Sequence, residues 1–244
     1  MKPVMKSLAN KFEFPYAGKE KIAKNTYTFS FGRNSKFDFI PGQYFKVNLQ
    51  IKNPDARGSS RYFTISSPNT NRTQIQITTR IIKSSFKKKL HSLKPGERVS
   101  FFGPIGYFTF NPKSKKQKIL LAGGIGITPF HSILTSLDYR YFKSNILLIA
   151  SFSKSEDVIY YEELKKIEKE NSNVRIVYAL SKEVSESFEK GRINKELIKK
   201  YSPHFPDSEF FIVGSPSFEE EMFDLVRKMN VPEEKIFKEN FTGY

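Results

Sequence analysis

The sequence contains no cysteine among its 244 residues, and it has only three histidines. Without cysteine the chain can form neither a disulfide bond nor a thiolate-ligated iron–sulfur cluster. His91, His131 and His204 lie far apart in the sequence, so we expect no metal site and interpret all three as packing or surface residues. Any redox chemistry would therefore depend on a bound organic cofactor.

Long hydrophobic runs are absent as well. No segment approaches the roughly 20 apolar residues that a membrane-spanning helix requires, so we expect no membrane span. The first residues, MKPVMKSLANKFEF, contain lysines but lack the apolar stretch of a secretory signal peptide. These absences favour a soluble, cytoplasmic protein. The length of the chain and its 38% hydrophobic residues are sufficient for two domains, each with its own core.

Acidic residues are scarce in the first half of the chain. Residues 1–112 contain 20 Lys and Arg but 5 Asp and Glu, a net formal charge of +15, whereas residues 113–244 contain 21 and 20, a net charge of +1. Such asymmetry indicates an acidic partner, although a solvated lysine-rich surface is an equal alternative. A nucleic-acid partner is disfavoured, because the basic residues do not interleave with exposed aromatic residues in a recognisable RNA-binding motif.

The first 112 residues have the pattern of an antiparallel β-barrel or sandwich. Short β-branched and aromatic runs are separated by turn formers such as Pro41-Gly42 and Pro95-Gly96. A single amphipathic helix interrupts these runs. We expect strands at 27–31, 43–51, 61–66, 74–81 and 98–102, and the helix at 84–93.

The second half alternates between compact apolar strands and helical segments, which predicts a parallel sheet with helices on both faces. The residues 113–116, Lys-Ser-Lys-Lys, are interpreted as a linker between domains 1–112 and 113–244. We expect strands at 118–122, 145–151, 174–179 and 209–214, and helices at 128–141, 159–170, 194–200 and 216–229.

The turn LLAGGIGITPF, residues 120–130, is a candidate dinucleotide site. A buried strand runs into Gly123, Gly124 and Gly126, followed by Thr128 as the expected N-cap and Pro129 at the first helical position. Glycines allow close approach of the backbone, and a helix N-terminus favours a pyrophosphate. The pattern departs from the full Gly-x-Gly-x-x-Gly motif, and packing alone is the alternative explanation for these glycines.

The segment after the next predicted strand bears on the choice of nucleotide. An acidic residue that would hold the ribose of NAD(H) is expected near this point, but Ser151 and Lys154 come first. These two residues favour the 2′-phosphate of NADP(H). Glu156 and Asp157 are close enough to take the acidic role, so NAD(H) stays open.

A second candidate anion site lies in the first half, in TRIIKSSFKKKL, residues 79–90. Ser84 and Ser85 precede a helix whose first turn carries Lys87, so hydroxyls, backbone N–H groups and an ammonium would converge. A serine cap on a solvated lysine-rich helix is the alternative.

In this order along the chain, the motifs resemble the ferredoxin–NADP reductase superfamily. They are Arg61-x-Phe63-Thr64, the helix start at 84–87, Pro104-x-Gly106-x-Phe108, the glycine turn, Gly214-x-Pro216 and Glu239-x-Phe241. The resemblance implies an N-terminal antiparallel β-barrel that binds FAD, followed by a Rossmann-like α/β domain that binds NAD(P).

The resemblance also implies roles for the strand RYFTIS, residues 61–66. Arg61 would pair with the FAD pyrophosphate, Phe63 would pack on the flavin, and Thr64 would hydrogen-bond near its reactive N5 edge, with Tyr62 in the same flavin-lining strand. Phe63 replaces the tyrosine common in the family. The second FAD-phosphate segment would comprise Thr79, Ser84, Ser85, Phe86 and Lys87, where the usual Gly-x-x-Ser has become Ser-x-x-Lys.

Near the C-terminus the resemblance places the nicotinamide site at Gly214, Ser215 and Pro216. The cysteine that many relatives have before this glycine is Val213 here. Glu239 would lie near the active site and Phe241 near the flavin ring, so that Thr64, Glu239 and Phe241 are the expected catalytic residues. A core anchor is the alternative for Phe241, and Tyr244 is a weaker candidate for covering the flavin.

These motifs predict an FAD-dependent NAD(P)H oxidoreductase. With no fused iron–sulfur domain, the electrons would pass to a separate acceptor, for which the basic first half favours an acidic ferredoxin or flavodoxin. An NAD(P)H-dependent reductase of free flavin, quinones or ferric complexes is the rival enzyme. A non-catalytic flavin-bound sensor and a basic nucleic-acid-binding protein are the alternatives of another class.

Overall fold

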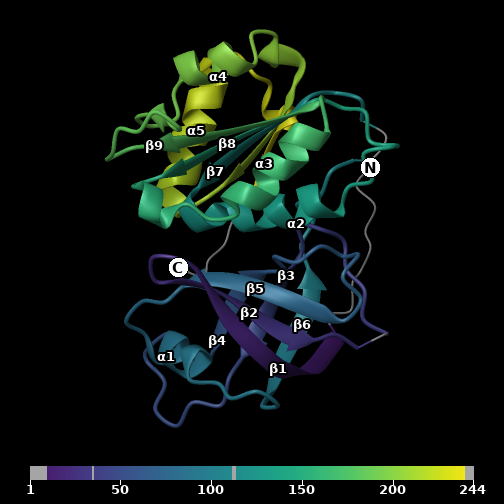
Figure 1. Ribbon diagram of the computed structural model, residues 1–244, viewed down its shortest axis with the longest axis vertical. Coiled ribbons are helices and arrows are strands. Elements are labelled where there is room, and N and C mark those ends of the chain that lie inside the picture. The colour runs from purple at the N-terminus through teal and green to yellow at the C-terminus, as the bar shows by residue number, and fades with distance from the viewer. Residues whose placement is uncertain (1–9, 35, 112–113, 240–244) are drawn as a thin grey trace. The chain divides into compact units, whose positions relative to one another are not determined.

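Two six-stranded sheets, one in each half of the chain, form the framework of the structure (Figure 1). The computed structural model describes residues 10–34, 36–111 and 114–239. The chain divides between Thr109 and Phe110 into a first and a second unit. Among the described residues, no helix is long and apolar enough to cross a membrane.

The first unit is an antiparallel sheet with the strand order β4-β3-β6-β1-β2-β5. Its edges approach each other, because Ser66, just after β4, donates its backbone N–H to the carbonyl of Gln76 in β5 at 2.8 Å. The sheet therefore curls toward closure, and the predicted antiparallel β-barrel is confirmed. The strands are β1 (Asn10–Ala23), β2 (Thr26–Gly32), β3 (Tyr44–Asn48), β4 (Ser60–Thr64), β5 (Gln74–Arg80) and β6 (Arg98–Ile105).

Aromatic rings fill the inside of this barrel. Phe14, Phe31 and Phe45 each pack against Phe101, with ring centroids 4.9 to 5.3 Å apart in edge-on arrangements. Such pairs add specific geometry to the burial of large apolar side chains. The one α-helix in the described part of this unit, α1 (Ser85–His91), covers the barrel by burying Phe86 and Leu90.

Several elements of the first unit differ from the predictions, and β6 extends beyond the predicted 98–102 to Ile105. The long strand β1 is not among the predicted strands, because Pro15, Gly18 and several lysines interrupt its alternation and only Phe14 and Tyr16 are buried. The predicted strands 43–51 and 61–66 end earlier, at Asn48 and Thr64.

The second unit is a parallel sheet with the strand order β10-β9-β8-β7-β11-β12, which confirms the predicted α/β architecture. One face forms a core with α4 and α5, and α3 lies on the other face (Figure 1). The strands are β7 (Lys118–Gly123), β8 (Ile146–Phe152), β9 (Val174–Leu180), β10 (Glu189–Lys190), β11 (Glu209–Val213) and β12 (Ile236–Lys238), and the α-helices are α2 (Thr128–Ser136), α3 (Tyr161–Glu170), α4 (Lys195–Tyr201) and α5 (Pro216–Lys228).

The edge strands β10 and β12 are not among the predicted strands, because segments of two and three residues carry no readable periodicity. The predicted helix 128–141 ends at Ser136, since Leu137 adopts extended backbone angles. Lys118, at the start of β7, is fully buried and forms an ion pair with Glu209 at 2.9 Å. This pair fixes the starts of two adjacent strands.

Candidate functional site

Arg61 in β4 donates four hydrogen bonds within the candidate flavin site. The side chain is 4% exposed, and its Nη1 donates to the carbonyls of Arg57, Gly58 and Ser60 at 2.8 to 2.9 Å. Its Nη2 donates to the Asp55 carboxylate at 2.9 Å. The guanidinium is therefore fixed by the loop between β3 and β4 before any ligand binds.

Asp55 ties this loop to the start of α1. Its Oδ2 accepts from the backbone N–H of Ser85 at 3.0 Å and from the Ser85 hydroxyl at 2.9 Å. Hydrogen bonds from Ser85, and then from Arg61 and the Arg57 backbone, lower the pKa of Asp55 to about 2. Asp55 and Arg57 are not among the predicted site residues. The turn formers Asn53 and Pro54 were the only local signal that this loop is ordered.

Lys87 completes the cluster from the first turn of α1. Its amine donates to the hydroxyl of Thr79 in β5 and lies 4.8 Å from the centroid of the Phe63 ring. Burial, together with the charges of Arg61 and Arg57, lowers the pKa of Lys87 to about 7. The fold thus brings together side chains that are distant in sequence.

The other predicted flavin-site residues of β4 point to opposite faces of the sheet, because side chains alternate along a strand. The Phe63 ring packs on Phe86 at 5.7 Å, on the same side of the strand as Arg61. Tyr62 points to the opposite side, is 36% exposed, and contacts the ring of Tyr44. Thr64 is buried at the end of β4. The Ser84 hydroxyl accepts from the backbone N–H of Lys87 at 3.1 Å, so this side chain serves as the cap of α1.

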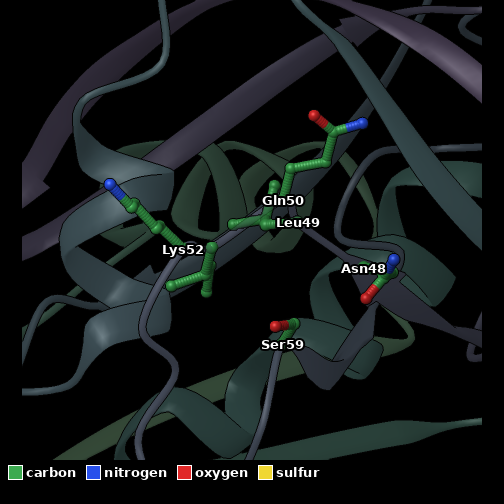
Figure 2. Close-up of a pocket in the computed structure, with 6 residues that line it drawn as sticks. Asn48, Leu49, Gln50, Lys52 and Ser59 are labelled. Carbon is green, nitrogen blue, oxygen red and sulfur yellow. The ribbon is translucent and has the colours of Figure 1, made fainter.

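An open pocket of about 530 Å³ flanks the loop that carries Asp55 (Figure 2). Residues 48–52 and Ser59 line it, and the close-up shows the polar side chains of Asn48, Lys52 and Ser59 around the hollow. The Ser60 hydroxyl donates to Asn48 at 3.0 Å and joins the two strands that frame the pocket. Arg61 itself is not among the residues that line this pocket.

In the second unit, the glycine turn has two distinct roles. A Cβ at Gly123 would lie 2.7 Å from the Phe218 ring, and a Cβ at Gly126 would lie 2.4 Å from the carbonyl oxygen of Val213. Packing therefore requires glycine at both positions. Gly124 has φ +54° and would meet nothing within 4 Å, so its backbone is the part of the turn that a ligand can approach.

The predicted N-cap role of Thr128 is wrong. Residues Gly124–Ile127 form a 3-10 turn that continues directly into α2, so Thr128 is the first residue of α2 and Pro129 the second. The Thr128 hydroxyl donates to the carbonyl of Ile125 at 3.0 Å and accepts no helix N–H in the contacts of the described chain. The helical run begins four residues earlier than the sequence pattern indicates.

The segment after β8 lies beside a carboxylate that the sequence pattern did not reveal. The backbone N–H and the hydroxyl of Ser155 donate to Glu183 at 3.0 and 2.7 Å. These bonds, and the charge of Lys154, lower the pKa of Glu183. Ser151 is the penultimate residue of β8 and is half-buried. The segment that was predicted to favour a 2′-phosphate, which includes Lys154, therefore lies beside the carboxylate of Glu183.

A pair of buried carboxyl groups lies where β11 and β12 end. Glu219 in α5 is 5% exposed and accepts from the backbone N–H of Gly214 at 3.4 Å, and Glu239 is 8% exposed. Burial raises the pKa of Glu239 to about 8, with Glu219 adding to the shift, and burial raises that of Glu219 to about 7. Within the described chain, Glu239 Oε2 has no hydrogen-bond partner.

The other predicted residues of this region have structural roles or lie outside the described residues. Ser215 caps α5, accepting from the N–H of Phe218 at 3.3 Å, and Pro216 is the first residue of that helix. Val213 is fully buried at the end of β11. Phe241 and Tyr244 lie outside the described residues. The described ranges contain no cluster of three or more His, Asp or Glu that could hold a metal ion.

Comparisons with known proteins agree with this division of sites. An oxidoreductase FAD-binding domain model matches residues 13–110, and an oxidoreductase NAD-binding domain model matches residues 120–224. The chain is 26% identical to a flavohemoprotein of Bacillus subtilis over 211 residues, which cover 84% of this chain and 52% of that protein. It is also 26% identical to a mouse NADH-cytochrome b5 reductase-like protein over 232 residues, which cover 89% and 72%.

The fold is shared with solved oxidoreductases. The ferredoxin NADP+ reductase of Neisseria gonorrhoeae, with bound FAD and NADP, aligns with a TM-score of 0.80 and 20% identity over 95% of this chain and 99% of that one. The FAD/NAD-binding domain of a Vibrio cholerae nitric oxide dioxygenase aligns with a TM-score of 0.82 and 19% identity, covering 94% and 98%. The matched FAD- and NAD-binding domains, in this order and on this fold, make the chain a member of the ferredoxin–NADP reductase superfamily and an FAD-containing NAD(P)H oxidoreductase.

Proposed function

We propose that the protein takes a hydride from a nicotinamide nucleotide onto FAD and passes the electrons to a separate acidic protein of the ferredoxin or flavodoxin type. The observation that carries this proposal is the division of charge along the chain. Residues 1–112, which contain the FAD-binding match, have a net formal charge of +15, whereas residues 113–244 have a net charge of +1. A strongly basic surface accelerates encounters with acidic partners and disfavours basic ones.

Bound FAD would supply the conversion of a two-electron donor into successive one-electron transfers. In this proposal Arg61, Ser85 and Lys87 hold its diphosphate. The fit rests on the donor set: the cluster contains guanidinium, amine and hydroxyl groups and one carboxylate, that of Asp55, which is engaged by Arg61 and Ser85. Planar guanidinium and ammonium donors are the groups that proteins use for phosphate oxygens.

The second unit would position the nicotinamide nucleotide. Gly124 offers an open backbone with a left-handed φ, which suits close approach of a diphosphate at the end of β7. Ligands of open parallel sheets bind beyond the carboxyl ends of the strands, where Gly214 and Glu239 also lie. Thr64, Glu239 and Phe241 stay our proposed active-site residues, with no proton transfer assigned to them.

The names of the relatives support a protein-bound acceptor. The matched proteins include flavohemoproteins and NADH-cytochrome b5 reductases, whose names refer to haem proteins. The chain spans about half the length of the flavohemoproteins it matches, with 52% and 53% of their lengths covered. These relatives therefore support electron transfer from FAD to another redox centre, while the acidic character of the acceptor rests on the charge division.

The test is the salt dependence of turnover. The FAD-loaded protein is supplied with NADH or NADPH, and reduction of a ferredoxin, a flavodoxin, cytochrome b5 or a neutral quinone is followed at increasing salt. We expect the rate with an acidic protein to fall steeply with ionic strength, because exposed charges are screened beyond about 8 to 10 Å at physiological salt. The rate with the neutral quinone should change little.

Other outcomes identify the alternatives. Efficient turnover with free flavin, quinones or ferric complexes, without a salt-sensitive protein acceptor, would establish the small-acceptor reductase instead. Bound FAD that no nicotinamide nucleotide reduces would indicate a sensor. Tight binding of DNA or RNA with a steep salt slope, in the absence of FAD binding, would replace the oxidoreductase proposal altogether.

A further inference from the structure

Lys87 carries a partly buried amine that faces other cations. Its Nζ contacts the Thr79 hydroxyl from β5 and lies over the face of the Phe63 ring from β4. The charged groups that act on it are the guanidinium groups of Arg61 in β4 and Arg57 in the preceding loop. No carboxylate of the described residues lies within 4.0 Å of this amine.

The carboxylate of Asp55, in the same cluster, forms its hydrogen bonds with groups other than Lys87. Asp55 accepts from Arg61 at 2.9 Å, from the Ser85 N–H at 3.0 Å and from the Ser85 hydroxyl at 2.9 Å, and it accepts from the Arg57 backbone at 3.1 Å. These four bonds direct the carboxylate to Arg61, Ser85 and the Arg57 backbone, and neither of its oxygens contacts the Lys87 amine. A partly buried ammonium beside two guanidinium groups is costly, so the amine loses its proton at a lower pH than an exposed lysine does until an anion arrives.

We propose that, above neutral pH, binding of FAD is coupled to the uptake of one proton by Lys87, whose amine becomes an ammonium beside the diphosphate. This inference rests on the proposed function, because it assumes that the cluster of Arg61, Ser85 and Lys87 holds the FAD diphosphate. The proton comes from solvent and adds to the lone pair of Nζ. No covalent bond to FAD forms.

The direction of the pH effect follows from the two states of the amine. In the free protein the pKa of Lys87 is lowered to about 7, and the diphosphate would raise it by supplying negative charge. Below this pKa the amine is already charged, so FAD binding takes up no proton. Above it, each binding event must recruit a proton, and Kd should rise by up to about tenfold per pH unit.

The experiment titrates FAD into protein freed of its flavin. Affinity is followed by flavin fluorescence from pH 6 to 9, and calorimetry at pH 8 is repeated in two buffers with different ionisation enthalpies. We expect the wild type to take up close to one proton per FAD at the higher pH. Lys87→Met should bind more weakly, without this uptake. Lys87→Arg should retain affinity and lose the pH dependence, because a guanidinium stays charged.

Lys88→Met is the matched control, since Lys88 is the exposed neighbour on the same helix. Its affinity, pH profile and proton uptake should equal those of the wild type. The proposal is overturned if the wild type binds FAD without proton uptake, or if Lys87→Met takes up the same proton. Failure of the wild type to bind FAD at any pH would instead remove the proposed function, and the inference with it.

Discussion

The carboxylate of Asp55 and the guanidinium of Arg61 meet at 2.9 Å, and the other oxygen of the same carboxylate holds the backbone and hydroxyl of Ser85. One side chain thereby joins the loop after β3, the strand β4 and the helix α1. Each partner belongs to the proposed diphosphate site. Asp55 is therefore expected to act on FAD through the orientation of Arg61.

Asp55→Asn should weaken FAD binding by about tenfold, because a neutral amide cannot make the charge-assisted bonds that orient Arg61. The measurement is the dissociation constant of FAD from fluorescence titration of the flavin-free protein. Asp38→Asn is the control, since Asp38 pairs with Arg33 in the same unit and is 69% exposed. Tighter binding by the Asp55 variant would mean that this carboxylate competes with the diphosphate.

Gly126→Ala should lower the stability of the fold, whereas Gly124→Ala should lower the affinity for the nucleotide. A methyl group at position 126 would collide with the backbone of Val213 at 2.4 Å, so this variant should unfold at a much lower denaturant concentration. At position 124 there is space, and only the left-handed φ is strained, at a cost of about 1 kcal/mol. The second variant should fold and lose nucleotide affinity.

Urea unfolding and nucleotide titration of both glycine variants decide between these roles. The separation of effects fails if Gly124→Ala binds the nicotinamide nucleotide as the wild type does. It also fails if Gly126→Ala is as stable as the wild type.

The buried carboxyl pair should make stability depend on pH. The pKa of Glu239 is raised to about 8 in the folded state, so the folded protein holds a proton that the unfolded chain releases above about pH 4.5. The contribution of Glu239 to the free energy of unfolding should therefore be greatest near pH 4.5 or below. It should decline as the pH rises toward 8. Glu239→Gln should remove on the order of 2 kcal/mol of this decline.

The free energy of unfolding of Glu239→Gln and wild type at pH 5, 7 and 9 tests this expectation. Glu220→Gln, an exposed glutamate in the same helix as Glu219, should follow the wild type at every pH. Parallel pH profiles for wild type and Glu239→Gln would show that Glu239 is ionised in the folded protein.

Nucleotide preference should respond to Glu183. Its carboxylate is bonded to Ser155 and would repel a 2′-phosphate held by this segment, so we expect wild type to favour NADH. Glu183→Gln should raise kcat/KM for NADPH severalfold and change that for NADH little. Glu186→Gln, at an exposed position further along the same loop, should leave the ratio unchanged. An unaltered ratio in Glu183→Gln would remove this carboxylate from the nucleotide site.

The sequence predicts the architecture wherever local pattern and burial agree. The apolar runs of β7, β8, β9 and β11 are buried on both faces and therefore stand out in the sequence. Strand β1 lacks such a pattern, because Pro15 and Gly18 interrupt it and much of it is exposed. It is held mainly by pairing with β2 and β6, which no local signal reports.

The residues of the candidate site also fall into those that local sequence motifs predict and those that only the folded structure reveals. Arg61 and Lys87 are predicted from motifs of neighbouring residues, whereas Asp55 becomes relevant only when the loop after β3 folds against α1. Glu183 was missed for the same reason, because the parallel sheet brings the loop after β9 next to Ser155. Glu219 bonds to Gly214, five residues earlier, but its proximity to Glu239 depends on the pairing of β11 with β12. Thr128 was misassigned because a 3-10 turn and an isolated N-cap have similar sequence patterns.

The contact between Gly126 and the carbonyl of Val213 sets a limit on how this protein can be redesigned. The backbone of Gly126 packs directly against the backbone of Val213, so no residue with a side chain can replace Gly126 to change the conformation of the turn. Efforts to exchange one nicotinamide nucleotide for the other would have to vary the loops that follow β8 and β9. In our proposal the turn is the invariant part of the nucleotide site, and the preference for one nucleotide would be changed in the segments around Ser155 and Glu183.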